Sequence, residues 1–169
     1  MEYSRFTDHF TYEEIIYDEL ALRKNIPNDI PIDCYQVALK LYDEIMEPIF
    51  DMFGPIRIIS GYRSEELNEL KGGDPSSQHV YSNMRGAACD WISKVDDDLY
   101  KMAYVIANSK IQFDRLIIEY PNSVYGGWIH ISCCGLPEEP NKVIAIKRNN
   151  TIKPITINNL KELMENNRE

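Results

Sequence analysis

A single acidic residue inside an apolar run constrains the fold of this chain most. Residues 86–93 read GAACDWIS, and the small and apolar residues on both sides of Asp90 predict a buried strand. A carboxylate buried without partners would be very unfavourable, so Asp90 must be paired, hydrogen-bonded or bound to a metal. The fold therefore has to bring suitable partners from other parts of the chain to Asp90.

Histidines are candidate partners, and the chain contains three. His79 precedes Asp90 by eleven residues, across a polar loop that ends at Gly86. A glycine there could allow the chain to turn back, so that both side chains meet at one point. His9 stands just before a predicted helix start, where a local packing or capping role is expected.

The third histidine lies in the run WIHIS at residues 128–132. Strand alternation puts His130 on the same face as Trp128, opposite two isoleucines that favour the core. Two imidazoles and one carboxylate suit a zinc ion with its fourth position open to water, which is typical of a catalytic site. The residues alone leave another interpretation open, in which these are separate side chains, each hydrogen-bonded to a neighbour.

The order of the predicted elements indicates the fold class. Thr11 and Glu14 form a capping box at the start of the first helix, and Ser64 is expected to cap a short helix. A long helix is expected over 33–53, with Pro48 kinking it or ending its regular part early. Strands are expected near 56–60, 87–92, 113–120, 128–134, 142–149 and 151–155, with further helices at 96–109 and 157–167. The pattern predicts an α+β fold with a mostly antiparallel sheet and helices packed on one side.

Composition excludes several classes of function. A net charge of −9 without a visible basic patch argues against a nucleic-acid partner. No run approaches the ~18 apolar residues that span a membrane, and the start of the chain has no apolar signal-peptide region. The four cysteines are scattered without a CxxC pair, which predicts free thiols instead of a thiolate zinc cluster or a disulfide scaffold. The 169 residues suit one domain in a protein that is cytoplasmic on synthesis.

Four motifs in order carry a resemblance to a known family. They are SGYRSEELN (60–68), GGDPSSQH (72–79), GAACDWI (86–92) and WIHIS (128–132). Together they resemble the zinc D-Ala-D-Ala carboxypeptidase family, which includes phage endolysin peptidases, vancomycin-resistance D,D-dipeptidases and, more distantly, the hedgehog signalling domain. The likeness runs from about His9 to Cys133 and implies a hedgehog/DD-peptidase-like fold.

The resemblance implies a set of metal ligands. The family binds Zn²⁺ through a histidine in a Ser-x-His element, an aspartate soon after it and a histidine on a later strand, which match His79, Asp90 and His130. The link between the first two ligands is longer here than is usual in the family. We expect the excess, around Tyr81 to Met84, to bulge out at the rim of the site and to bear on substrate preference.

The catalytic base has two candidates. Several branches of the family carry an acid three residues before the last histidine, but that position is Gly127 here. Other branches take the acid from the preceding strand, where Glu119 fits at the end of FDRLIIE. Asp114 is the alternative, although it falls on the opposite strand face, and Glu119 could also be a glutamate at the strand end without a catalytic role.

Further residues of the motifs are expected to contact substrate. Arg63 follows a strand-to-helix turn, where its guanidinium can hold a carboxylate or a polarised carbonyl. It could instead tie the turn to Glu65 or Glu66. Ser77 and Gln78 could donate hydrogen bonds to substrate or only shape their turn, and Trp128 lies beside His130 on the same face.

These expectations combine into one functional hypothesis. The resemblance implies a single zinc peptidase domain over 1–169 that cleaves peptidoglycan stem peptides, as a D,D-carboxypeptidase or an endolysin-like endopeptidase. Such a protein would reach the cell wall after release from the cell or as part of a phage particle. The alternative is a metal-stabilised binding or structural module of the same fold that has lost catalysis.

Overall fold

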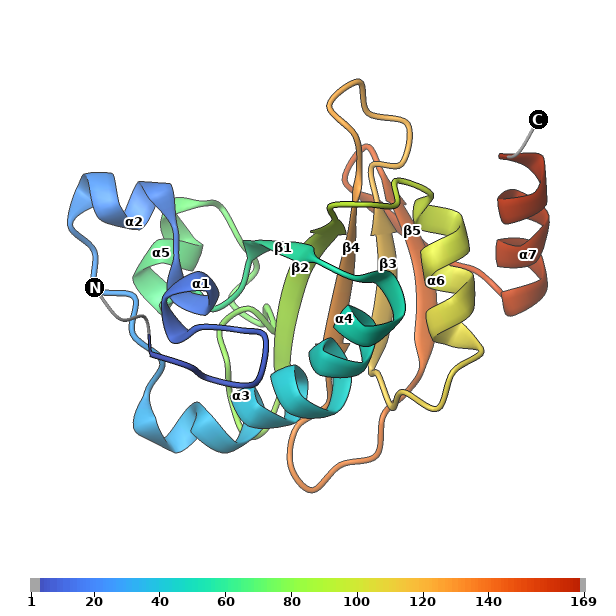
Figure 1. Cartoon of the computed structure of the whole chain (residues 1–169). Helices are drawn as coiled ribbons and strands as arrows, with labels where there is room; N and C mark the ends of the chain where they lie inside the picture. The colour runs from blue at the N-terminus through green and yellow to red at the C-terminus, as the bar shows by residue number, and fades with distance from the viewer. Residues whose placement is uncertain (1–3, 168–169) are drawn as a thin grey trace.

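The centre of the fold is a six-stranded sheet, seen in a computed structural model that describes residues 4–167 (Figure 1). Its order is β1-β2-β4-β3-β5-β6, and all neighbouring pairs are antiparallel except the parallel pair β3–β5. The strands are Ile56–Ser60 (β1), Ala87–Ser93 (β2), Arg115–Glu119 (β3), Trp128–Cys133 (β4), Val143–Arg148 (β5) and Thr151–Pro154 (β6). The predicted α+β class with a mostly antiparallel sheet is confirmed.

The two faces of the sheet differ because alternate side chains point to opposite sides. One face is apolar and belongs to the main core, with Cys89, Trp91, Leu116, Ile118, Ile129 and Ile131 all fully buried. The other face carries polar residues at the intervening positions, among them Asp90, Glu119 and His130. We refer to this second side as the polar face.

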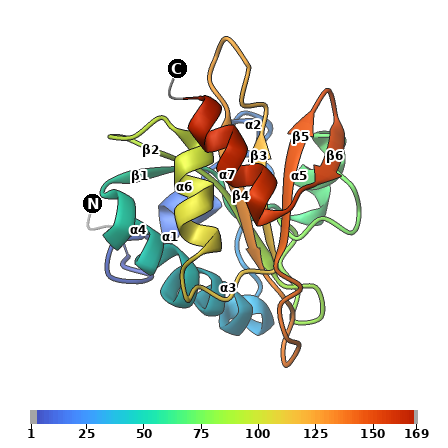
Figure 2. The same cartoon turned by 90° about the vertical axis from the view of Figure 1, so that its right-hand side faces the viewer.

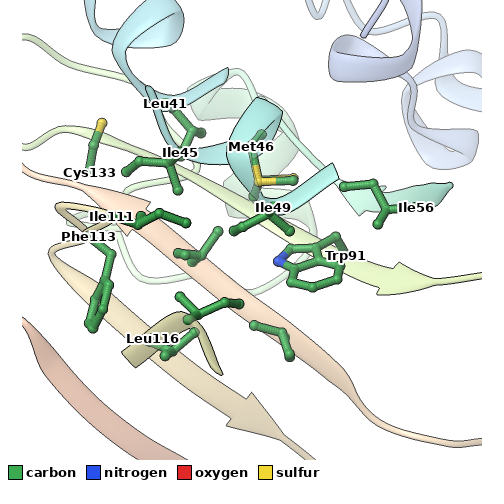
Figure 3. Close-up of a cluster of buried hydrophobic side chains, with 14 of the residues drawn as sticks. Leu41, Ile45, Met46, Ile49, Ile56, Trp91, Ile111, Phe113, Leu116 and Cys133 are labelled. Atoms are coloured by element: carbon green, nitrogen blue, oxygen red, sulfur yellow. The ribbon is translucent and has the colours of Figure 1, made fainter. Parts of the chain in front are cut away.

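The predicted long helix covers the apolar face, but it is not uniform. It consists of α3 (Tyr35–Leu41), the π-helical turn η2 (Tyr42–Met46) and α4 (Glu47–Phe53), after a short 3₁₀ turn η1 (Ile32–Cys34). Pro48 lacks an amide hydrogen and disturbs the preceding helical turn. The wider turn, in which the Glu47 amide donates to the Tyr42 carbonyl, accommodates it. Figure 3 shows Ile45, Met46 and Ile49 directed from this segment toward the sheet.

The predicted first helix begins at the expected cap, but two short helices take the place of one. Thr11 forms the expected capping box at the start of α1 (Tyr12–Ile16). Asp18 then accepts hydrogen bonds from the amides of Leu20 and Ala21 and starts α2 (Glu19–Lys24). These helices and α5 (Glu65–Leu70), which Ser64 caps as predicted, gather beside β1 (Figure 1).

The last two helices complete the same layer. The helix α6 (Leu99–Ala107) packs on β3 and β4, and α7 (Ile157–Asn166) packs on α6 (Figure 2). The strands β5 and β6 form the predicted hairpin, with Asn149 and Asn150 both at positive φ of 48° and 59°. Within residues 4–167, every helix is too short or too polar to cross a bilayer.

Candidate metal centre

A row of directly paired residues brings two candidate ligands together on the polar face. Ser60 of β1 pairs with Asp90 of β2, Asp90 pairs with His130 of β4, and His130 pairs with Ile117 of β3. Side chains opposite one another on the same face have Cβ atoms about 4.5–5.5 Å apart. The register of the sheet therefore fixes the contact between Asp90 and His130.

The third candidate ligand comes from the loop before β2. Gly86 has φ of +96°, and a Cβ atom there would lie 1.9 Å from the Cys133 carbonyl oxygen, so the return of the chain requires glycine. The His79 carbonyl accepts a hydrogen bond from the Arg63 amide at 2.9 Å. Its ring Nδ1 lies 2.8 Å from the Gly61 carbonyl oxygen. These contacts hold the imidazole of His79 against the end of β1, with Nε2 directed at Asp90.

The three side chains form one compact donor set. Asp90 Oδ1 lies 2.8 Å from His130 Nδ1 and 3.3 Å from His79 Nε2. One donor atom of each residue lies within 4.8 Å of the other two. Zinc bonds of 2.0–2.1 Å in a tetrahedron place neighbouring donors about 3.3 Å apart. The set therefore fits a zinc ion, and the contact of His79 Nδ1 with a carbonyl oxygen is the outer partner usual for a metal-binding imidazole.

Burial and charge prepare these residues for a cation. Burial lowers the pKa of His79, which favours the neutral imidazole that binds metals. Burial alone would raise the pKa of Asp90, but its contacts with the imidazoles of His79 and His130 outweigh this effect and hold that pKa well below the ordinary value. The site thus presents an ionised carboxylate beside an imidazole that resists protonation.

Arg63 supports the donor set from the side. Its Nη2 lies 3.6 Å from Asp90 Oδ2, and its Nε donates to Ser60 Oγ at 2.9 Å. One carboxylate oxygen of Asp90 thus meets the guanidinium, and the other meets the two histidines. Among residues 4–167, the ion pair of Arg63 is with Asp90, and it forms none with Glu65 or Glu66.

A single cleft of about 650 Å³ contains all the predicted site residues. Its lining includes Arg63, Ser77, Gln78, His79, Asp90, Glu119, Trp128 and His130. The donor set lies in this cleft, and the strands β3, β5 and β6 extend it to one side. The cleft thus combines a donor set that could hold a metal ion with open space beside it.

Glu119 lies one row away from the ligands. It pairs with Trp128, two residues from His130, and the side chains of diagonal neighbours approach within about 7–8 Å. Its carboxylate is nearly buried, with Oε2 at 2.9 Å from Lys147 Nζ. Glu119 therefore shares the cleft with the donor set without belonging to it.

The two other positions considered for the catalytic acid, 127 and 114, do not provide a free carboxylate in the cleft. A Cβ atom at Gly127 would lie 2.4 Å from the Glu119 carbonyl oxygen, so the glycine there allows the β3–β4 loop to fold tightly. Asp114 is buried and accepts hydrogen bonds from the backbone and side-chain amides of Asn141 and from Gln78. It does not belong to the lining of the cleft.

The remaining predicted contact residues are partly engaged by the protein. Ser77 Oγ accepts a hydrogen bond from the His79 amide. The amide nitrogen of Gln78 lies within hydrogen-bond distance of Asp114 and of the carbonyls of Arg85 and Cys133. Trp128 is half-buried, and its ring lies 5.2 Å from that of Tyr120. The structure gives both Ser77 and Gln78 a role in shaping their turn.

The prediction that the longer link bulges at the rim of the site is wrong for Tyr81 and for the location, although Met84 is 82% exposed. Tyr81 is buried in the core, where its hydroxyl contacts that of Tyr42. A tight turn closes between Ser82 and Gly86, and the Asn83 side chain donates to the Asp33 carbonyl. An aromatic ring can bury more area in the core than at a rim, and the extra residues lie outside the lining of the cleft.

Sequence reasoning missed three cleft residues on the β5–β6 side. Lys147 contacts Glu119, Asn150 accepts a hydrogen bond from the Tyr120 hydroxyl, and Ile152 lies on the cleft wall. The Asn149-Asn150 turn signals a hairpin, but it does not indicate which strand the hairpin joins. The four cysteines are buried free thiols, as predicted.

Comparison with known proteins gave one finding. A family model described as Peptidase M15 matches residues 8–132. The matched segment contains the donor set, Arg63 and Glu119, and it ends before β5. No curated protein and no solved structure matched the chain.

Proposed function

The chain belongs to the peptidase M15 family, and we propose that it is a zinc-dependent peptidase that cleaves peptidoglycan stem peptides. The observation that carries the proposal is the convergence of His79, Asp90 and His130 in a cleft that also holds a carboxylate. A purely structural metal site needs neither an accessible cleft nor a nearby acid. The combination favours chemistry over a structural role.

The metal would be held by His79 Nε2, Asp90 Oδ1 and His130 Nδ1. When bound, zinc with three protein ligands supplies a fourth position for water and a Lewis acid. The contact of His79 with the Gly61 carbonyl fixes the ring orientation. Arg63 fixes the rotamer of Asp90 through its second oxygen.

Glu119 is the proposed general base. It accepts a proton from the attacking water and returns it to the leaving amine, so the carboxylate is regenerated at the end of the cycle. Its position one row from His130 is compatible with a water that bridges the two residues. Asp114 is a poorer candidate because its oxygens already accept hydrogen bonds from Asn141 and Gln78.

Substrate contacts are assigned to the cleft residues that lie beside the donor set. Arg63 is a charged donor near the metal ligands, suited to the substrate carbonyl as negative charge develops on it. Ser77 and Gln78 lie on the loop that carries His79, and Trp128, which pairs with Glu119, offers an indole. The four motifs that resemble peptidoglycan peptidases support stem peptides as the substrate, cut by a carboxypeptidase or an endopeptidase after the protein reaches the cell wall.

Digestion of purified peptidoglycan, analysed by mass spectrometry, tests the proposal. We expect new muropeptides with one peptide bond hydrolysed, and elemental analysis should give one zinc per chain. The masses of the products distinguish a released terminal residue from a cut cross-link. Bound zinc without any hydrolysis would contradict the proposal and favour a non-catalytic module.

A further inference from the structure

The cleft has a cationic residue that lies outside the segment matched by the family. Lys147, on β5, is directly paired with Glu119 of the parallel neighbour β3. Its Nζ lies 2.9 Å from Glu119 Oε2, and the two side chains are 26% and 8% exposed. The contact is therefore largely shielded from solvent, unlike the surface ion pairs that contribute little.

We infer that Lys147 is a positioning residue for Glu119, supplied to the active site by the β5–β6 hairpin. The inference rests on the proposed function, in which Glu119 is the base. The contact of Oε2 with the ammonium group holds the carboxylate in one orientation. Among residues 4–167, the hydrogen bonds of this carboxylate come from Lys147 alone.

Neighbouring contacts hold Lys147 itself in place. Its Nζ also lies 5.4 Å from the centre of the Tyr120 ring, within the range of a cation–π interaction. The Tyr120 hydroxyl donates to Asn150 at 2.6 Å, and the Tyr120 amide donates to the Lys147 carbonyl at 2.9 Å. The hairpin thus holds Tyr120, one partner of the ammonium group, and Lys147 is strand-paired with the other, Glu119.

Tyr120 adopts a conformation that these contacts must maintain. Its φ is +50°, which is uncommon for a bulky side chain and strains the backbone. Such a conformation persists where surrounding contacts impose it, and here they come from β5 and from the hairpin turn. The strained residue directly follows Glu119, so the same contacts set the end of β3 that carries the base.

The proposed role differs from that of a purely structural ion pair in what its loss would change. A structural pair stabilises the β3–β5 contact, and its removal lowers the free energy of unfolding without a specific effect on turnover. A positioning residue affects the transition state more than substrate binding, so its loss lowers kcat and leaves KM near the wild-type value. In a protein that already lacks the base, removing the positioning residue should not lower kcat further.

The experiment measures kcat and KM for hydrolysis of a soluble muropeptide by the zinc-loaded protein. We expect Lys147→Met to lower kcat by about 10- to 100-fold, the range for a lost hydrogen bond to a charged group. Lys147→Arg, which keeps the charge, should restore most of the loss. In the Glu119→Gln background, Lys147→Met should add little further loss, because both changes act through one group.

Control variants distinguish a positioning effect of Lys147 from misfolding and from a wrong assignment of the base. Arg148 is the next residue on β5 and donates to the Tyr100 hydroxyl, so Arg148→Met should leave kcat unchanged. Lys147→Gln replaces Lys147→Met if the latter does not fold, as judged by thermal unfolding and zinc content. Unchanged kcat in folded Lys147 variants, or a full additional loss in the Glu119→Gln background, would overturn the inference and leave the proposed function standing. An active Glu119→Gln protein would instead refute the base, and the inference with it.

Discussion

The polar face of the sheet has two halves that are built differently. Over β1, β2 and β4 lies the donor set, in which each ligand contacts another ligand or the end of β1. Over β3, β5 and β6 lies Glu119, whose carboxylate depends on Lys147 of a strand from much later in the chain. We call these the metal half and the base half.

Under the proposed function, the two halves would divide the tasks of metal binding and proton transfer between them. The metal half is held by antiparallel neighbours and by segments inside the family match. The base half depends on the parallel β3–β5 pairing and on a hairpin outside that match. Changes in the hairpin should therefore alter turnover while zinc binding stays intact, and the following experiments test this division.

Removing a ligand should have the largest effect. His79→Ala leaves two protein ligands, so we expect a zinc content near zero and activity below detection. The loss should exceed the roughly 10- to 100-fold typical of losing an outer partner of a ligand. Elemental analysis of protein purified without chelator measures the zinc, and undiminished zinc would refute the assignment.

His9→Ala is the matched control for the metal half. The His9 ring stacks on Phe50 at 3.9 Å, and its Nδ1 lies 2.6 Å from Glu47 Oε2. Neither of these contacts involves the donor set. This variant should keep its zinc and its turnover, with only a modest decrease in stability. Loss of zinc from both variants would indicate general unfolding instead of a lost ligand.

A substitution in the base half should lower turnover without loss of zinc. Glu119→Gln keeps the shape of the side chain but cannot accept a proton, so turnover should fall by about 10²–10⁴-fold. Zinc content should be unchanged, since the donor set does not include this residue. Steady-state rates together with elemental analysis on the same sample give both quantities.

Asp114→Asn provides the comparison for Glu119→Gln. Asp114 accepts hydrogen bonds from Asn141 and Gln78, and an amide there would place a donor against these donors. We expect a lower free energy of unfolding, by about 1–3 kcal/mol, with turnover largely kept in the folded fraction. If Asp114→Asn abolishes activity while Glu119→Gln does not, the base lies at 114.

The sequence predicts the metal half better than the base half for a physical reason. Asp90 in an apolar run, the alternation in WIHIS and a glycine before β2 are local patterns, and each restricts where its side chain or turn can lie. The strand faces of His130 and Glu119, the cap at Ser64 and the hairpin at Asn149-Asn150 follow from such patterns. The assigned chemical roles and the single domain over 1–169 stay predictions.

Non-local features were not predictable in the same way. The pairing of β5 with β3, which brings Lys147 to Glu119, joins segments that no local pattern relates. Burial of Tyr81 depends on the position of Tyr42 in a helix far from it in the sequence. The break after α1 arises because Asp18 caps a new helix, a local competition that the apolar spacing does not reveal.

Two glycines at positive φ offer a test of how tightly the metal half is built compared with the β3–β4 loop. Gly86, in the metal half, has φ of +96°, and an added Cβ would lie 1.9 Å from a backbone oxygen. Gly126, in the β3–β4 loop, has φ of +77° and nothing within 4 Å. Gly86→Ala should lower the free energy of unfolding by more than the roughly 1–3 kcal/mol of backbone strain alone, and Gly126→Ala by no more than that strain. Denaturant unfolding measures both, and equal losses would show that the chain near Gly86 can relax.

The smallest expected effect concerns the far wall of the cleft. Ile152 pairs with Lys147 on the polar face, lines the cleft and is 48% exposed. Contact with substrate would bury part of this side chain, so Ile152→Ala should raise KM by about 2- to 5-fold at unchanged kcat. Val143→Ala is the control, because Val143 lies on the same face with 37% exposure and outside the cleft lining. Steady-state kinetics of both variants decide the matter. A fall in kcat for Ile152→Ala would mean that the residue acts through the position of the hairpin, and hence through Lys147, instead of through substrate contact.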